Sequence, residues 1–299
     1  MKDTGPMFED TWPRPPDDDL EVRPARLWTA DKLAIVRYYL PGFAKACAKA
    51  KTFHFVDGFA GPGVNLIGGE RVAGSPLIAL ESSPAFAKCL LMDASERVVS
   101  TLQARTTSYG NRAVVERGDC NADLLPLMQR HLGRWDPALI LLDPEGCELS
   151  WETVTGIASF KTKKTKLEQL ILLATHTGFL RTLTVEEEAP EWAARNMTHL
   201  YGTDEWRGIY ESRKRREITT DQATTKYVRL YADRLKGLGY GHVIAREIRD
   251  KAFEGRLRYF LVFATQHKIG AKIMRKAFDT VASAPSYQAT LFRRERTEE

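Results

Sequence analysis

A glycine-rich segment at residues 53–63 is the stretch of this chain whose residue types and spacing most clearly suggest chemistry. It reads FHFVDGFAGPG, so a short apolar run ends in an acid and a turn follows at once. Glycines remove side chains where the backbone turns sharply and lies close to a bound group. The segment therefore predicts a first β-strand that ends at a small ligand, with candidate contacts Asp57, Gly58, Phe59, Gly61 and Gly63.

The spacing of these glycines separates two classes of cofactor. Nicotinamide-binding turns have the spacing G-x-G-x-x-G and open directly into a helix. Here the spacing is G-x-x-G-x-G, and no helical pattern starts after Gly63. A pyrophosphate favours bare N–H groups at a helix N-terminus, whereas Asp57 suits the cationic α-amino group of S-adenosylmethionine. We therefore expect S-adenosylmethionine as the cofactor; an ordinary glycine-rich turn of another α/β protein is the alternative.

Three further apolar runs also end in an acid. They predict strands that end at Asp93, Asp119 and Asp143. We expect Asp93 to accept hydrogen bonds from two ribose hydroxyls and Asp119 to meet an adenine amino group. A single strand-end aspartate is more often a helix N-cap. Four in succession, the first with a glycine turn, instead indicate the ligand-binding edge of a parallel sheet.

The chain resembles the three-Cys-motif partner proteins (TcmP), a family of class I methyltransferase-like proteins. The resemblance runs from about residue 27 to 280 and rests on KLAIVRYYL at 32–40, VDGFAGPG at 56–63, GSPLIAL at 74–80, LDP at 142–144 and YFLVFAT at 259–265. It implies a methyltransferase-like fold and a three-Cys-motif protein as a partner. Family members tend to carry an aromatic residue where this chain has Glu145, and amino-methylating enzymes use such a residue to stack the target base. This departure argues against methylation of a base amino group.

Two functions from different classes follow from these residues. The first is methyl transfer to nucleic acid, in which Asp143 orients or deprotonates the nucleophile and Glu145 assists. The second is a non-catalytic partner that keeps the fold and serves a three-Cys-motif protein in nucleic-acid processing. A nicotinamide oxidoreductase is disfavoured by the glycine spacing.

The order of apolar segments predicts an α/β protein with a Rossmann-like class I methyltransferase fold. We expect a mostly parallel seven-stranded sheet that is closed by an antiparallel C-terminal hairpin, because the runs at 242–248 and 257–264 have only a short connection. The expected organisation is an extended N-terminal arm at 1–26, a methyltransferase-like domain at 27–284 with a helical insertion at about 184–222, and a basic tail at 285–299.

Two basic clusters point to a polyanionic partner, although the net charge is only +5. We expect both clusters to contact phosphates near the substrate mouth, with Trp206 and Tyr210 able to stack on unpaired bases. A solvated charged face is the alternative. The residues concerned are Lys161, Lys163, Lys164 and Lys166 in one cluster and Arg213, Lys214, Arg215 and Arg216 in the other.

The remaining composition is typical of a cytoplasmic protein. The four cysteines are scattered without a C-x-x-C pair, so we expect reduced thiols and no metal site. No apolar run approaches the ~20 residues that a membrane span needs. The acidic, proline-rich N-terminus does not resemble a signal peptide.

Overall fold

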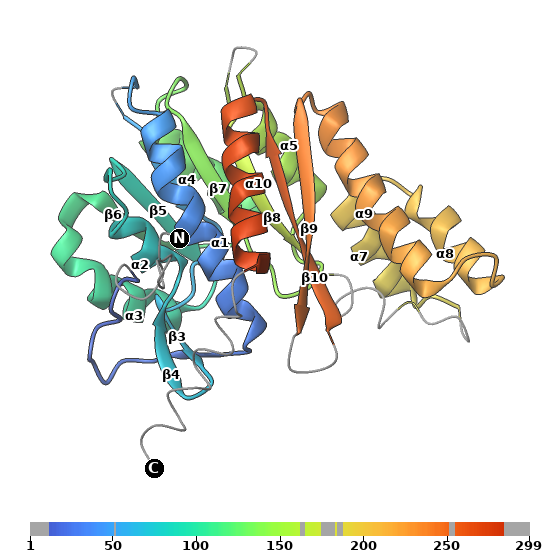
Figure 1. Cartoon of the computed structure of the whole chain (residues 1–299), viewed down its shortest axis with the longest axis horizontal. Coiled ribbons are helices and arrows are strands. Elements are labelled where there is room, and N and C mark those ends of the chain that lie inside the picture. The colour runs from blue at the N-terminus through green and yellow to red at the C-terminus, as the bar shows by residue number, and fades with distance from the viewer. Residues whose placement is uncertain are drawn as a thin grey trace, which may run out of the picture.

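The computed structural model describes residues 12–50, 52–161, 165–174, 183, 188–250 and 255–283. Its centre is a seven-stranded sheet with the order β6-β5-β2-β7-β8-β10-β9 (Figure 1). The strands are β2 (His54–Asp57), β5 (Lys88–Asp93), β6 (Ala113–Arg117), β7 (Ala138–Leu142), β8 (Glu168–Leu173), β9 (His242–Asp250) and β10 (Arg256–Thr265). In this sheet β10 runs opposite to the other six strands, so the predicted fold class is confirmed.

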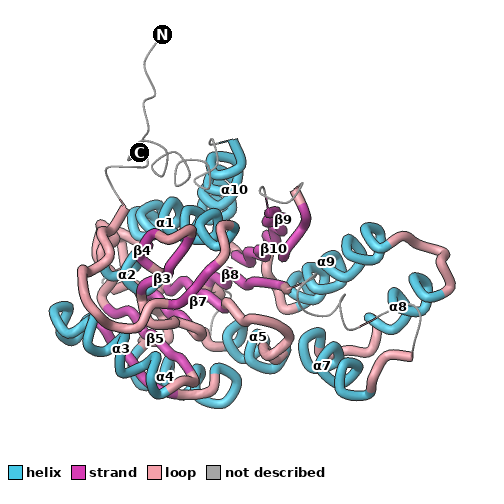
Figure 2. Tube along the Cα trace, turned by 90° about the horizontal axis from the view of Figure 1, so that it is seen from below, coloured by secondary structure: helices cyan, strands magenta, loops and turns pink. Residues whose placement is uncertain are grey.

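The sheet separates two hydrophobic cores, because alternate residues of each strand face opposite sides. In β7, Leu139 and Leu141 belong to one core, whereas Ile140 and Leu142 belong to the other. Every residue of β7 is buried, as expected for a parallel strand that is covered on both faces. Figure 2 shows α1 (Trp28–Ala46) and α10 (Lys268–Ser283) on one face, and α4 (Cys120–His131) and α5 (Trp151–Ser159) on the other.

The connections place short helices between the strands and a second small sheet at one edge. The helical connections are α2 (Ser75–Leu80), α3 (Glu96–Thr106) and the 3-10 helix η1 (Thr107–Arg112). The small sheet has the order β1-β3-β4 and consists of β1 (Arg23–Ala25), β3 (Val64–Ile67) and β4 (Glu70–Ala73). It lies below the edge at which the parallel strands end, which we call the carboxyl edge (Figure 1). The opposite edge is the amino edge.

Within the described residues, three helices lie between β8 and β9 in the chain and extend the core that contains Ile140 and Leu142: α7 (Glu191–Tyr201), α8 (Trp206–Lys214) and α9 (Thr220–Gly237). Trp206 is fully buried and Tyr210 is 2% exposed. The prediction that these two aromatic residues are available to stack on bases is therefore wrong. They form the apolar face by which the amphipathic α8 packs against its neighbours. None of the described helices has the length and hydropathy that a membrane span requires.

Candidate functional site

A cavity of about 300 Å³ opens at the carboxyl edge, where open α/β sheets bind their ligands. Its walls come from β1, the start of α1, the glycine loop at residues 58–63 and the segment that follows β7. The side chains that carry its charge are Arg23, Arg26, Lys32, Asp143 and Glu145. Three are cationic and two are anionic, so the cavity could receive an anionic group.

Asp57 lies behind the glycine loop and does not line this cavity. It is fully buried; its Oδ2 accepts a hydrogen bond from the Ser75 hydroxyl at 2.6 Å and its Oδ1 accepts one from the Phe59 amide at 3.1 Å. Burial raises the pKa of Asp57 to about 7, although both hydrogen bonds oppose this shift. Asp57 thus braces the turn. Its direct contact with a ligand amino group stays a prediction that has no support in this geometry.

The three glycines of the loop serve different purposes. Gly58 packs against α4, because a Cβ there would lie 2.7 Å from the Cys120 sulfur. Gly61 and Gly63 have φ angles of +65° and +85°, which glycine adopts without strain. The open side of Gly61 faces Arg23, whose Nη1 lies 3.7 Å from the position that a Cβ would take. Gly61 and the half-buried Phe59 therefore bring the loop to the cavity.

Asp93 is the last residue of β5 and Asp119 lies between β6 and α4, and neither lines the described cavity. Asp93 Oδ2 accepts the Gly61 amide at 3.0 Å, so the structure does bring Asp93 to the glycine loop. Asp119 is exposed and caps α4, accepting the Asn121 amide at 2.8 Å. Both acids stand at the expected edge, but their roles toward ribose and adenine stay predictions.

Asp143 and Glu145 each form an ion pair that the sequence did not reveal. Lys32 of α1 donates to Asp143 Oδ2, and both side chains are nearly buried. Arg23 of β1 donates to Glu145 Oε1, where the carboxylate is 78% exposed. Lys32 is the first residue of the segment 32–40 that resembles the TcmP family, and this resemblance is the sequence feature that could have identified it. Nothing near Arg23 in the sequence marks it as a partner of Glu145.

Lys161 does not lie near the cavity of the carboxyl edge. It lies beside Cys47 and Glu168 at the amino edge, because α5 carries the chain back across the sheet after β7 (Figure 1). Burial lowers the pKa of Lys161. Lys166 lines the same amino-edge cavity, so the expected position of this cluster at the substrate mouth is wrong for Lys161 and Lys166. Lys163 and Lys164 lie outside the described residues.

The second basic cluster precedes α9 and is partly engaged within the fold. Arg213 Nη1 donates to the Leu183 carbonyl at 2.8 Å, Lys214 pairs with Glu188, and Arg215 pairs with Glu217 at 2.7 Å. Arg216 is exposed. The end of α9 leads to the first residue of β9, which lies at the amino edge. The start of α9, and with it this cluster, therefore lies toward the carboxyl edge.

No group of three or more His, Cys, Asp or Glu side chains that could hold a metal ion occurs within the described part of the chain. Each of the four cysteines is free, and Cys89 and Cys120 are buried.

The comparisons with known proteins support the fold. Neither a protein-family model nor a curated protein matches this chain. Among solved structures, protein LPL1258 of Legionella pneumophila, described as family DUF519, has a TM-score of 0.50 at 10% identity, and the match covers 84% of this chain and 92% of that chain. Membership of the TcmP family stays a prediction.

Two further solved structures have lower TM-scores, which add nothing about function. The methyltransferase domain of bacterial CtHen1-CN is 13% identical with a TM-score of 0.38, covering 77% of this chain and 99% of that chain. An O-methyltransferase from Bacillus cereus in complex with SAH is 11% identical with a TM-score of 0.41, covering 79% and 80% of the two chains.

Proposed function

We propose that the protein is a cytoplasmic S-adenosylmethionine-dependent methyltransferase that acts on nucleic acid. The observation that carries this proposal is the contact of Asp93, at the end of β5, with the amide of Gly61 in the loop that follows the adjacent strand β2. It sets a carboxylate beside an open glycine loop at the edge where such sheets bind nucleosides.

The residues of this edge fit the proposed cofactor. Each carboxylate oxygen can accept two hydrogen bonds, so Asp93 keeps acceptor capacity for ribose hydroxyls beside its bonds to the amides of Gly61 and Ser95. Asp57 and Gly58 would hold the loop in place from the side of the core. Phe59, Gly61 and Gly63 would form its ligand-facing surface, and Asp119 would lie at the adenine end of the cofactor. When bound, the cofactor would supply an electrophilic methyl group.

The chain would contribute positioning and proton transfer to this reaction. Asp143 lies on the wall of the cavity, and Lys32 holds one of its oxygens. The other oxygen can accept a hydrogen bond from an attacking hydroxyl or amine and thereby orient it. Glu145 lies on the same wall, so it can assist at the mouth.

Calorimetry with S-adenosylmethionine and S-adenosylhomocysteine (SAH) tests the cofactor assignment. We expect micromolar or tighter binding that NADH does not compete with. Asp93→Ala should weaken binding at least several-fold, since each lost hydrogen bond is worth about 1–3 kcal/mol. The matched control is Asp233→Ala, an exposed acid on α9. Unchanged affinity in a folded Asp93→Ala variant would contradict the ribose assignment.

The polymer substrate is tested by transfer of labelled methyl groups to mixed DNA and RNA. The cationic side chains Arg23 and Arg26 on the cavity wall, together with the exposed Arg216, support a phosphate-bearing substrate. Neutralising Arg216 should reduce the slope of log affinity against log salt by about 0.7 on single strands. Lys161→Gln is the control at the amino edge. If only Lys161→Gln changed the salt dependence of polymer affinity, the polymer would bind at the amino edge, which contradicts this proposal.

A non-catalytic role beside a three-Cys-motif protein is the second candidate. It is favoured by the ion pairs of Asp143 and Glu145, because a carboxylate that already binds a cationic side chain is less available as a catalytic base. It predicts SAH binding without methyl transfer to any polymer, in the presence or absence of the three-Cys-motif protein. Transfer by the protein alone would exclude it.

A further inference from the structure

The segment before α1 contributes a wall of the cavity. Residues 23–25 form β1, which pairs in parallel with β3 of the hairpin that follows the glycine loop. This pairing carries the Arg23 side chain into the cavity, between Gly61 on one side and Glu145 on the other. Arg23 is therefore placed where a ligand that touches the glycine loop would meet it.

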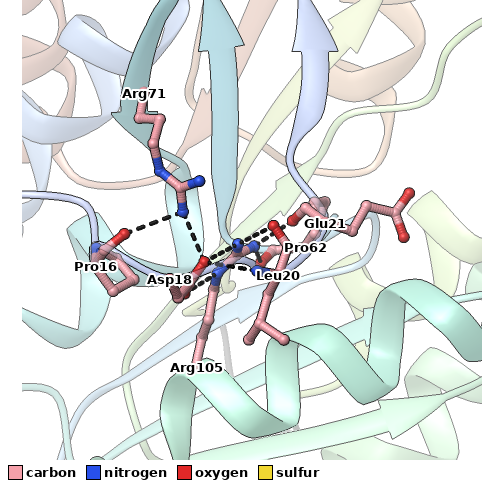
Figure 3. A network of polar contacts seen from close by, with 7 residues as sticks. All are labelled: Pro16, Asp18, Leu20, Glu21, Pro62, Arg71 and Arg105. Atoms are coloured by element: carbon pink, nitrogen blue, oxygen red, sulfur yellow. Dashed lines mark hydrogen bonds and ion pairs between the residues drawn. The ribbon is translucent and has the colours of Figure 1, made fainter.

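One buried arginine fixes this segment to the glycine loop. The Arg105 side chain is fully buried; its Nη1 donates to the Pro62 carbonyl at 2.7 Å and to the Glu21 carbonyl at 2.6 Å. Its Nε and Nη2 donate to the two oxygens of Asp18 at 2.9 and 2.7 Å. Figure 3 shows the residues of this network: Pro16, Asp18, Leu20, Glu21, Pro62, Arg71 and Arg105. The segment and the loop are thus held as one unit.

The ion pair between Arg23 and Glu145 lies close to solvent. Glu145 is 78% exposed and Arg23 is 35% exposed, and ion pairs at such positions contribute little to stability. A guanidinium group presents its N–H donors in a fork that matches a carboxylate or a phosphate. The pair with Glu145 occupies one of these donors, Nη2.

We propose that Arg23 is the anion-binding residue of this cavity, which releases Glu145 and binds an oxyanion of the ligand. Two sources share this chemistry: the carboxylate of the cofactor's amino-acid end and a phosphate of the substrate strand. The inference rests on the proposed function of the cavity and adds a recognition residue to it.

Two variants with opposite expected effects test the exchange. Arg23→Gln should weaken SAH binding about 10- to 100-fold, the effect of losing a charge-assisted hydrogen bond. Glu145→Gln should strengthen it, because the competing carboxylate is removed. S-adenosyl-3-thiopropylamine, which is SAH without its carboxylate, should bind equally to wild type and Arg23→Gln.

The second arm uses a single-stranded oligonucleotide. If the oxyanion is a substrate phosphate, Arg23→Gln weakens oligonucleotide binding, lowers the salt slope by about 0.7 and leaves SAH binding unchanged. The matched control is Arg97→Gln, which removes the exposed pair of Arg97 with Glu21 outside the cavity. It should change neither affinity, and thermal unfolding checks that every variant is folded.

The outcomes separate this inference from the proposed function. A structural pair would make Arg23→Gln and Glu145→Gln weaken binding alike, which overturns the exchange. Unchanged affinity of Arg23→Gln for every ligand that the wild type binds also overturns it and leaves the proposed function standing. A wild-type protein that binds neither SAH nor oligonucleotide overturns both.

Discussion

The two edges of the sheet each carry a cavity of about 300 Å³ with a lysine and an acid on its wall. At the carboxyl edge these are Lys32 and Asp143, and at the amino edge they are Lys161 and Glu168. Residue types alone would describe both cavities in similar terms. The hydrogen bonds of the two acids make them different.

Glu168 is committed to the fold. It is 5% exposed and accepts hydrogen bonds from the hydroxyls of Tyr39 and Thr265, so it links α1, β8 and β10. Burial raises its pKa. Asp143 instead stands beyond the end of β7, where the chain has left the sheet, and it binds one lysine at the cavity wall. A carboxylate that the core already uses is a poor candidate for chemistry, whereas one at a loop can serve a ligand.

The largest expected effect concerns the contact between the segment before α1 and the glycine loop at the carboxyl edge. Arg105→Ala removes the guanidinium group that donates hydrogen bonds to the Asp18 carboxylate and to the Pro62 carbonyl. We expect the free energy of unfolding to fall by about 3–5 kcal/mol, because the buried guanidinium also donates to the carbonyls of Leu20, Glu21 and Pro62 and each unsatisfied group costs about 1–3 kcal/mol. Denaturant unfolding measures this loss. Arg97→Ala, which removes an exposed pair with the same segment, should cost much less; equal losses would contradict a central role for Arg105.

The second prediction tests the chemical role of the same edge. Asp143→Ala should lower the rate of methyl transfer about 10²- to 10⁴-fold while SAH affinity stays almost unchanged, because a positioned acid–base group acts on the reaction rather than on the cofactor. Single-turnover kinetics and calorimetry measure the two quantities. Equal rates in wild type and variant would remove Asp143 from the mechanism.

The third prediction concerns Glu168 at the amino edge, whose loss should affect stability rather than chemistry. Glu168→Ala leaves the hydroxyls of Tyr39 and Thr265 without their acceptor, and each unsatisfied buried group costs about 1–3 kcal/mol. We expect lower stability with unchanged SAH affinity in the folded fraction. Glu152→Ala on α5, an exposed acid, is the control. A specific loss of SAH binding would mean that the two edges are coupled.

The fourth prediction concerns a difference in pH dependence between two acids of the carboxyl edge. Burial raises the pKa of Asp57 to about 7 from its ordinary value of 3.8, so the native state keeps a proton that the unfolded state loses. Its contribution to stability is therefore lost as pH rises from about 4 to about 7. Hydrogen bonding to Arg105 lowers the pKa of Asp18 to about 2, so its contribution is lost as pH falls below about 4.

Unfolding curves of Asp57→Asn and Asp18→Asn from pH 2 to pH 8 measure these contributions. Relative to wild type, Asp57→Asn should gain stability as pH rises through the range 4–7. Asp18→Asn should lose its disadvantage at the acidic end. Parallel curves for wild type and Asp57→Asn would show that Asp57 is ionised in the folded protein throughout this range.

The sequence by itself determined the sheet and the glycine turn at its carboxyl edge. Uninterrupted apolar runs such as 138–142 predict buried parallel strands, because both faces of such a strand lie in a core. The short connection before 256–265 required an antiparallel hairpin. Gly61 and Gly63 were identifiable because a left-handed turn depends on the residue itself. These features follow from local periodicity and local backbone preference.

Only the tertiary structure decided which charged groups meet. Glu145 pairs with Arg23 across 122 positions and Asp143 with Lys32 across 111, and no local pattern links residues so distant in the chain. The burial of Trp206 and the position of Lys161 at the amino edge likewise depend on how α5 and α8 pack. The type of a charged or aromatic residue does not reveal whether its side chain lies on the surface or in the core. Its partners are set by the topology that brings distant segments together.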